Sequence, residues 1–256
     1  MLNQFFKDSL NKLSDQGLRR TMRVNEEAQS ARIVIDGVQY LNFCSNNYLG
    51  LADDIRINKA AIESIELNGF GSGASRLVCG SMSAHTELEK SIADFKGAES
   101  CLVFSSGYMA NVGTISSIFG KDDAIFCDRL NHASIIDGIL LSQAKFHRYA
   151  HCDMESLESM LQSSETAGKK CIITDSVFSM DGDVAPLDKI VELAEKYQCS
   201  VMIDEAHALG VMGKTGKGLA EHFGVEDKID IQMGTLSKAA GSFGAYVCGS
   251  KELIEY

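Results

Sequence analysis

A lysine in the segment 233–239, which reads MGTLSKA, stands just after a run of strand-forming residues. The amine of Lys238 can form a Schiff base with an aldehyde, and the hydroxyl groups of Thr235 and Ser237 can bind a phosphate group. The alternative is a solvated surface lysine beside two turn hydroxyl groups. The segment therefore indicates covalent chemistry only if the other groups that such chemistry needs occur elsewhere in the chain.

Asp204 closes the apolar run 200–203, and His207 follows shortly after it. A carboxylate at the end of a buried strand is costly unless a cation or strong hydrogen-bond donors face it. A protonated ring nitrogen is such a cation, and His207 can donate a hydrogen bond to an oxygen on the same ring. Alternatively, Asp204 only caps the segment that follows the strand.

The segment 105–111, SSGYMAN, joins an expected strand to an expected helix. Gly107 permits a close approach of the backbone, and the free N–H groups at the helix start suit a phosphate dianion. A glycine turn before a helix is common, so this segment carries weight only together with the others.

Two more strand ends carry polar side chains, His132 in NHAS and Ser179 in FSMDGD. The imidazole of His132 can stack on a planar ring, and the hydroxyl of Ser179 can hydrogen-bond a ring oxygen. Taken singly, a lone histidine is more often a structural residue, and the alternative for Ser179 is a turn serine.

Pyridoxal phosphate requires all of these groups together: a lysine, a carboxylate facing the pyridine nitrogen, a flat group over the ring, and donors for the phosphate. The sequence supplies the phosphate loop, histidine, serine, Asp/His pair and lysine in this order, on five successive strand ends. We therefore predict pyridoxal phosphate as the cofactor, and no metal site.

The pattern from about residue 100 onward alternates short β-type runs with longer helix-type segments, which predicts an α/β fold with a largely parallel sheet. In such sheets ligands gather at the carboxyl ends of the strands. The expected strands are 101–106, 124–128, 146–150, 171–177, 200–204, 229–234 and 245–249. The expected helices are 108–118, 134–143, 154–163 and 187–197, the last beginning after Pro186.

The first hundred residues follow a different pattern. They predict a helix over 2–20, a hairpin of strands 32–35 and 39–43 around an Asp-Gly turn, a helix near 55–67 and an irregular glycine-rich segment, 69–76. We expect residues 1–45 to form part of a small α+β domain and residues 46–256 to form most of the large cofactor-binding domain.

Composition excludes several classes of protein. The chain has 256 residues and a formal net charge of −11, which argues against binding to nucleic acid or to an anionic membrane. No apolar run is long enough to cross a bilayer, and the N-terminus does not resemble a secretory signal. The 8 cysteines are scattered among apolar runs, as expected for reduced thiols in the cytoplasm.

A nucleotide-driven motor is the alternative from a different class. Residues 204–207 read DEAH, and residues 213–215 resemble the end of a phosphate-binding loop. However, the order of the two motifs is reversed, and Gly216 and Gly218 interrupt the helix that such a loop must enter.

The motifs as a set resemble the α-oxoamine synthases, which are pyridoxal-phosphate enzymes of fold type I. The resemblance covers essentially the whole chain. It rests on SNNYLGL (45–51), GSGASRLVCG (71–80), SSGYMAN, NHAS, FSMDGD, DEAHALGVMGKTGKG (204–218) and GTLSKA. It implies the large domain of a fold type I transferase, with a mainly parallel sheet and the N-terminal part of a small α+β domain.

The resemblance also implies a role for each matching residue. It assigns catalytic roles to Lys238, His132 and Asp204, and cofactor contacts to Gly107, Tyr108, His132, Ser179, Asp204, His207, Thr235, Ser237 and Lys238. Asn46 and His132 would bind the substrate, together with Arg19, whose register is open because Arg20 is adjacent.

The implied reaction is a decarboxylative condensation of L-alanine with a pimeloyl thioester, carried by coenzyme A or a carrier protein, as in biotin synthesis. Glycine with an acetyl thioester and serine with a long acyl chain stay open as alternatives, because the donors differ only by small groups. The family also implies a homodimer and a further C-terminal part beyond Tyr256. The chain is thus expected to be a fragment of a longer protein, and a cofactor-binding but inactive protein is a further alternative.

Overall fold

The computed structural model describes residues 1–165 and 168–256, which divide into two compact units, 1–44 and 45–256. The first unit holds helix α1 (Leu2–Asp15) and the antiparallel hairpin of β1 (Arg32–Ile35) and β2 (Val38–Leu41). Helix α1 ends before the predicted Arg20 because Gly17 adopts a left-handed φ of 67°. The hairpin turn has the positive φ angles at Asp36 (52°) and Gly37 (72°) that the Asp-Gly pair predicts.

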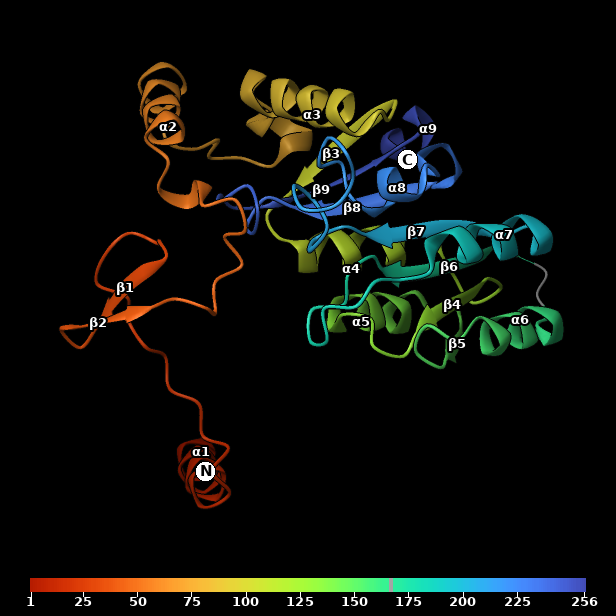
Figure 1. Cartoon of the computed structure of the whole chain (residues 1–256), viewed down its shortest axis with the longest axis horizontal. Helices are drawn as coiled ribbons and strands as arrows, with labels where there is room; N and C mark the ends of the chain where they lie inside the picture. Colours follow the sequence, from red (N-terminus) through yellow and green to blue (C-terminus); the bar gives the residue numbers. More distant parts are fainter. Residues whose placement is uncertain (166–167) are drawn as a thin grey trace. The chain divides into compact units, whose positions relative to one another are not determined.

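The second unit is built on a seven-stranded sheet in the order β3-β9-β8-β7-β6-β4-β5 (Figure 1). The strands are β3 (Ser100–Phe104), β4 (Ala124–Asp128), β5 (Lys145–Tyr149), β6 (Lys170–Asp175), β7 (Ser200–Asp204), β8 (Ile231–Thr235) and β9 (Ala245–Gly249). Strands β5, β4, β6, β7 and β8 pair in parallel, whereas β9 is antiparallel to both β8 and β3. The predicted α/β class and mainly parallel sheet are confirmed.

The second unit has eight helices within the described residues, and those from α4 to α8 lie between strands of the sheet in sequence. They are α2 (Ile55–Asn68), α3 (Ser83–Lys96), α4 (Gly107–Ile118), α5 (Ala133–Ser142), α6 (Met154–Ser163), α7 (Leu187–Tyr197), α8 (Leu219–Phe223) and α9 (Lys251–Glu255). Short 3-10 turns occur at Leu51–Asp53 and Glu226–Lys228, and Arg76–Gly80 forms one π-helical turn.

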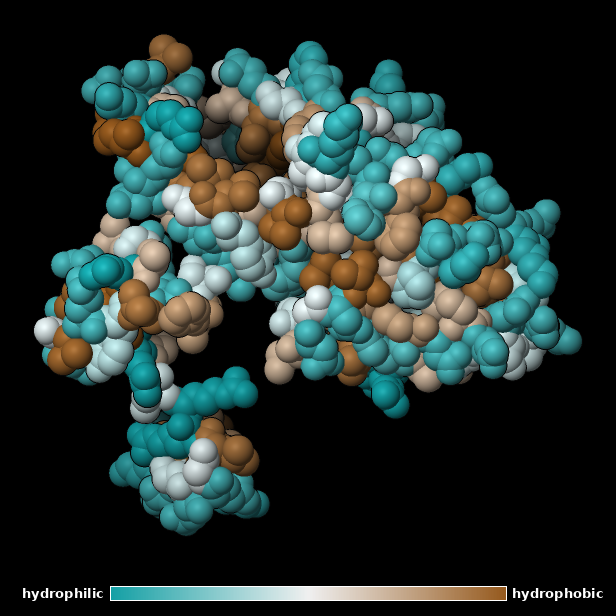
Figure 2. Space-filling view, viewed as in Figure 1, coloured by the Kyte–Doolittle hydropathy of each residue, from teal (hydrophilic) through white to brown (hydrophobic). Residues whose placement is uncertain are grey.

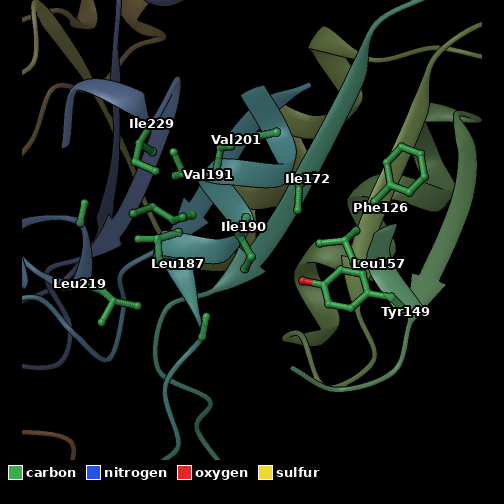
Figure 3. Packing of buried hydrophobic residues seen from close by; sticks show 14 of the residues in the cluster. Phe126, Tyr149, Leu157, Ile172, Leu187, Ile190, Val191, Val201, Leu219 and Ile229 are labelled. Atoms are coloured by element: carbon green, nitrogen blue, oxygen red, sulfur yellow. The ribbon is translucent and has the colours of Figure 1, made fainter. Parts of the chain in front are cut away.

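Alternate residues of each central strand enter separate hydrophobic cores on the two faces of the sheet, as expected for strands covered on both sides. Phe126, Ile172 and Val201 pack with side chains of α6 and α7 on one face (Figure 3). The intervening residues, such as Ile125 and Met202, pack with side chains of α4 and α5 on the other face. The strand ends are therefore held rigidly from both sides.

Several predicted boundaries are wrong, and three elements were not predicted. Strand β6 ends at Asp175 rather than Val177, and β8 begins at Ile231 rather than Ile229. Helix α3 was missed, as were the five-residue helix α8 and the π-helical turn that follows the glycine-rich segment. These elements pack against the sheet margins, where few of their side chains are buried and the apolar periodicity is weak.

The surface of the second unit carries exposed apolar side chains over α2 and in the hollow beside α3 (Figure 2). Leu49, Leu51, Phe95 and Leu236 line this hollow. Within the described residues, no helix combines the length and the apolar character that a membrane span requires.

Candidate functional site

The carboxyl ends of the central strands meet at one edge of the sheet and surround a cavity of about 180 Å³. The strand register places Asp175 of β6 beside Asp204 of β7, and Asp204 beside Met233 of β8. All the residues predicted to bind the cofactor line this cavity: Gly107, Tyr108, His132, Ser179, Asp204, His207, Thr235, Ser237 and Lys238. The strands that lead to these residues are β3, β4, β6, β7 and β8. They are not successive along the chain, because the edge strand β5 comes between β4 and β6 in sequence.

Lys238 lies within a short chain of hydrogen bonds. Its Nζ is 2.7 Å from Nε2 of His207, and Nδ1 of His207 is 2.6 Å from the hydroxyl of Tyr48. Burial lowers the pKa of Lys238 and lowers that of His207 to about 4, so the imidazole is uncharged at neutral pH. Burial raises the pKa of Tyr48. A free amine, the form that can attack an aldehyde, is therefore favoured at Lys238.

Asp204 is buried at the end of β7, where Oδ1 accepts a hydrogen bond from the Ala206 N–H at 2.9 Å and Oδ2 accepts one from Nδ2 of Asn111 at 2.9 Å. Burial raises the pKa of Asp204, although these two donors act in the opposite direction. The neighbouring Asp175 is also buried, and burial together with Asp204 raises its pKa well above the usual range. Two carboxyl groups in one buried site favour a bound cation.

The start of helix α4 forms another wall of the cavity. The Ser106 side chain caps this helix by accepting a hydrogen bond from the Met109 N–H at 3.2 Å. A Cβ atom added at Gly107 would lie 3.7 Å from Cε of Met233 and 4.0 Å from Cβ of Thr235. The glycine therefore keeps open the space between the helix start and the Thr235 hydroxyl, which is itself 2.8 Å from Oγ of Ser237.

His132 precedes α5 and caps that helix through its side chain. Its N–H donates to Oδ2 of Asp175 at 2.9 Å, and its Nδ1 accepts a hydrogen bond from the Ser134 N–H at 3.2 Å. These bonds fix the ring at the mouth of the cavity, where a planar ligand can stack on it. Ser179 is exposed in the loop after β6, within reach of the same space.

Besides His132, the predicted substrate residues are Asn46 and Arg19, and these two differ in placement. Asn46 accepts a hydrogen bond from the Tyr48 hydroxyl at 3.3 Å, which connects it to His207 and the cavity. Arg19 belongs to the N-terminal unit, where its guanidinium is 3.5 Å from Oγ of Ser14. A substrate-binding role for Arg19 or Arg20 stays a prediction.

The phosphate-loop-like segment 213–215 does not offer its N–H groups to a nucleotide. The N–H and hydroxyl of Thr215 and the N–H of Lys217 all donate to the carboxylate of Glu221. A protein side chain thus occupies the anion-binding position, which contradicts the nucleotide-driven alternative.

Asp128, His151 and Cys152 bring three possible metal ligands within 4.8 Å of one another in the described part of the chain. Both imidazole nitrogens of His151 are already hydrogen-bonded, to Asp128 at 2.9 Å and to Asp183 at 2.6 Å. Burial raises the pKa of the Cys152 thiol to about 11, which disfavours a metal-binding thiolate. The group therefore serves to attach the 178–183 loop to the end of β4.

Sequence reasoning missed four residues of the site: Tyr48, Asn111, Ser134 and Asp175. Tyr48, Asn111 and Ser134 lie inside motifs that were singled out, and Asn111 follows Gly107 by one helical turn, which places both on the same helix face. Asp175 is the last residue of β6 and shortly precedes the FSMDGD motif. Asp204 is likewise the last residue of the next strand, β7. This repetition is the signal that could have identified it.

The fold and the site together define the class of protein. Residues 38–256 match the model of the family described as aminotransferase class I and II, and the chain therefore belongs to that family. The solved structure of serine palmitoyltransferase from S. paucimobilis, with a bound aldimine of PLP and myriocin, matches with a TM-score of 0.92 and 34% identity. The match covers 100% of this chain and 65% of the serine palmitoyltransferase chain.

Curated relatives narrow the class further. A putative 8-amino-7-oxononanoate synthase from Acetivibrio thermocellus is 55% identical over 251 residues, which are 98% of this chain and 64% of that protein. The 8-amino-7-oxononanoate synthase from Citrifermentans bemidjiense is 54% identical, over 99% of this chain and 65% of that protein. The chain thus spans slightly less than two thirds of these relatives, and its predicted resemblance to the α-oxoamine synthases is confirmed.

Proposed function

We propose that the cavity binds pyridoxal phosphate and that the protein condenses L-alanine with a pimeloyl thioester to give 8-amino-7-oxononanoate, carbon dioxide and free thiol. The observation that carries the proposal is the convergence of Lys238, Asp204 and His132 on one cavity. The names of the relatives at 54–55% identity support the same reaction, a step of biotin synthesis.

The residues of the cavity fit this cofactor. Asp204 is a buried carboxyl group that lacks a cationic partner among the hydrogen bonds described above, and a protonated pyridine nitrogen would supply one. The open space at Gly107, the helix start and the hydroxyl groups of Thr235 and Ser237 suit a phosphate. When bound, pyridoxal phosphate supplies an electron sink for the charge that develops at the amino-acid Cα.

Each residue then has a defined task. The amine of Lys238 attaches the cofactor and later removes the Cα proton as general base. The uncharged His207 holds that amine at 2.7 Å, and Asp204 keeps the pyridine nitrogen protonated. His132 would stack on the bound ring, Ser179 would hydrogen-bond the ring oxygen, and Asn46 would lie near the substrate carboxylate. His207 would contact the ring oxygen by exchanging its present hydrogen bond with Lys238 for that contact.

Covalent trapping tests the assignment of Lys238. We expect borohydride reduction of the protein in the presence of pyridoxal phosphate to add the reduced cofactor to the Lys238 peptide, as measured by mass spectrometry. Lys238→Ala should lose both the adduct and turnover. The matched variant Lys214→Ala, in an exposed loop, should keep both. Full activity in Lys238→Ala would overturn the proposal.

The choice of substrates has a separate test. The likeness to serine palmitoyltransferase, at a TM-score of 0.92, keeps serine with a long acyl chain as the second candidate. Thiol release should be followed for alanine, glycine and serine, each with acetyl, pimeloyl and palmitoyl thioesters of coenzyme A and of a carrier protein. Alanine with a pimeloyl thioester should react fastest. Cofactor binding without thiol release from any pair would indicate an inactive cofactor-binding protein.

We also propose that the protein acts as a homodimer in the cytoplasm. Helix α2 supports the dimer, because none of its side chains is buried and Ile55, Ile62, Ile65 and Leu67 are exposed. The unpaired state of all 8 cysteines supports a reducing compartment.

A further inference from the structure

Two side chains, those of Asn111 and Ser134, connect the carboxyl group of Asp204 to the imidazole of His132 at the mouth of the cavity. Oδ2 of Asp204 accepts a hydrogen bond from Nδ2 of Asn111 at 2.9 Å, and the same Nδ2 donates to Oγ of Ser134 at 2.9 Å. Oγ of Ser134 is in turn 2.7 Å from Nδ1 of His132. The chain of contacts therefore runs Asp204–Asn111–Ser134–His132.

The chemistry of the groups fixes the direction of every bond in this chain. An amide nitrogen only donates hydrogen bonds, so Oδ2 of Asp204 and Oγ of Ser134 both accept from Nδ2 of Asn111. Both hydrogens of that amide are then used, one on Asp204 and one on Oγ of Ser134. Because Oγ accepts from Asn111, its own hydrogen is free to be donated to Nδ1 of His132.

Nδ1 of His132 also receives the backbone N–H of Ser134, at 3.2 Å. A nitrogen that accepts hydrogen bonds from two donors carries no proton of its own. The proton of the neutral imidazole therefore lies on Nε2, which the chain leaves available as a donor to a bound molecule.

We propose that Asn111 and Ser134 are positioning residues, which hold the Asp204 carboxylate in place and fix the proton of His132 on Nε2. The part of this proposal that concerns ligands rests on the proposed function.

Burial shows that these two residues are not placed for packing alone. Asn111 and Ser134 are both 0% exposed, and Oδ1 of Asn111 has no hydrogen-bond partner within residues 1–165 and 168–256. A buried amide oxygen without a partner costs free energy that an apolar side chain would avoid. Retaining an amide here is explained by the two hydrogen bonds that its nitrogen donates.

The first test uses the 256-residue chain without cofactor, so that it does not depend on the proposed function. Nitrogen-15 NMR of histidine-labelled protein reports which ring nitrogen is protonated, and His132→Gln identifies the signals of His132. We expect a protonated Nε2 and a hydrogen-bonded, unprotonated Nδ1. A proton on Nδ1 overturns the proposal.

Variants separate positioning from a merely structural role. Ser134→Ala should shift the Nδ1 signal toward that of a nitrogen with one donor fewer. Ser142→Ala is the matched control, since it removes a buried hydroxyl from the same helix, and it should leave the His132 signals in place. An unchanged Nδ1 signal in Ser134→Ala, with the fold intact by circular dichroism, overturns the proposal.

Asn111→Ala tests the other end of the chain. Loss of the Asn111 donor should raise the pKa of Asp204 further, as followed by the carbon-13 titration of its carboxyl group. In the same variant, pyridoxal phosphate should bind about 10- to 100-fold more weakly. An unshifted Asp204 titration contradicts the positioning role, whereas failure of the wild-type chain to bind the cofactor contradicts only the proposed function.

Discussion

His207 occupies a central place at the scale of single residues, because it contacts the reactive amine on one side and a phenol on the other. An uncharged imidazole can accept a hydrogen bond at one nitrogen while it donates from the other. The Lys238 amine therefore gains a partner without facing a second positive charge. The proposed reaction also requires this arrangement, since the lysine would act as a base in it.

The low pKa of His207 has a consequence for stability. An unfolded histidine titrates near 6.5, whereas His207 in the folded protein titrates at about 4 because it is buried. Between these values the unfolded chain binds more protons than the folded one, so stability rises with pH. We expect the contribution of His207 to the free energy of unfolding of the cofactor-free protein to fall as the pH is lowered from 6.5 to 4.

Urea unfolding at several pH values measures this slope, and His207→Gln should reduce it. The exposed His222 provides the control, because His222→Gln should leave the slope unaltered. An equally steep slope in the His207 variant would show that another group causes the pH dependence.

At the scale of elements, helix α4 joins the site to the fold. Its first turn faces the cavity, and its later residues Ile115 and Ala110 pack into the core on one face of the sheet. The N–H groups of the first turn are consequently held in place by the buried part of the same helix. An anion bound there meets donors that need no rearrangement.

Gly107→Ala tests this role of the helix start. The added methyl group would make only ordinary contacts with Met233 and Thr235, so we expect the fold to be kept, with stability changed by at most about 1 kcal/mol. The methyl group would occupy the space proposed for the phosphate, and pyridoxal phosphate should bind about 10-fold more weakly.

Fluorescence titration with the cofactor measures this affinity. Gly113→Ala, in the same helix, is the matched control, because its Cβ would lie 3.5 Å from Phe104 outside the cavity lining. Equal cofactor affinity in both variants would refute the proposed phosphate position.

Sequence predicted the elements best where both faces of a strand are buried. The strands at 124–128, 200–204 and 245–249 were placed correctly because their runs of apolar residues are uninterrupted. The direction of β9 is not encoded in such a run. Its connection to β8, residues 236–244, is too short for the crossover that a parallel pair needs, and this length was the usable signal.

The candidate site was predictable to the extent that its residues follow strands. Side chains that contact the cavity from a helix or from a distant loop, such as Asn111 and Tyr48, were missed as functional residues. Their relevance depends on distances to Asp204 and His207, which only the folded chain defines.

At the scale of the whole molecule, the second unit has a well-covered sheet but a poorly covered helix. The central strands are buried on both faces, whereas α2 exposes five large aliphatic side chains, Ile55, Ile57, Ile62, Ile65 and Leu67. Apolar surface of this kind is commonly covered by another protein surface. The proposed homodimer offers such a surface.

Replacing Ile62 and Ile65 by glutamate tests this arrangement. The double variant should shift the protein from dimer to monomer, because two charges at a buried interface are strongly unfavourable. Light scattering coupled to size exclusion measures the mass. Lys59→Glu, on the same helix, is the control for added charge, and a monomeric wild-type protein would contradict the proposal.

The position of β9 between β8 and β3 has a consequence for how the protein is made. Among the strands of the described residues, β3 pairs only with β9, which follows β8 in sequence, so β3 has no partner until β9 leaves the ribosome. Contacts this distant in sequence slow folding and leave a strand edge open to aggregation. The loop 105–107, which follows β3, is therefore among the last segments to take its place beside the cavity, and the proposed phosphate position is completed only at that step.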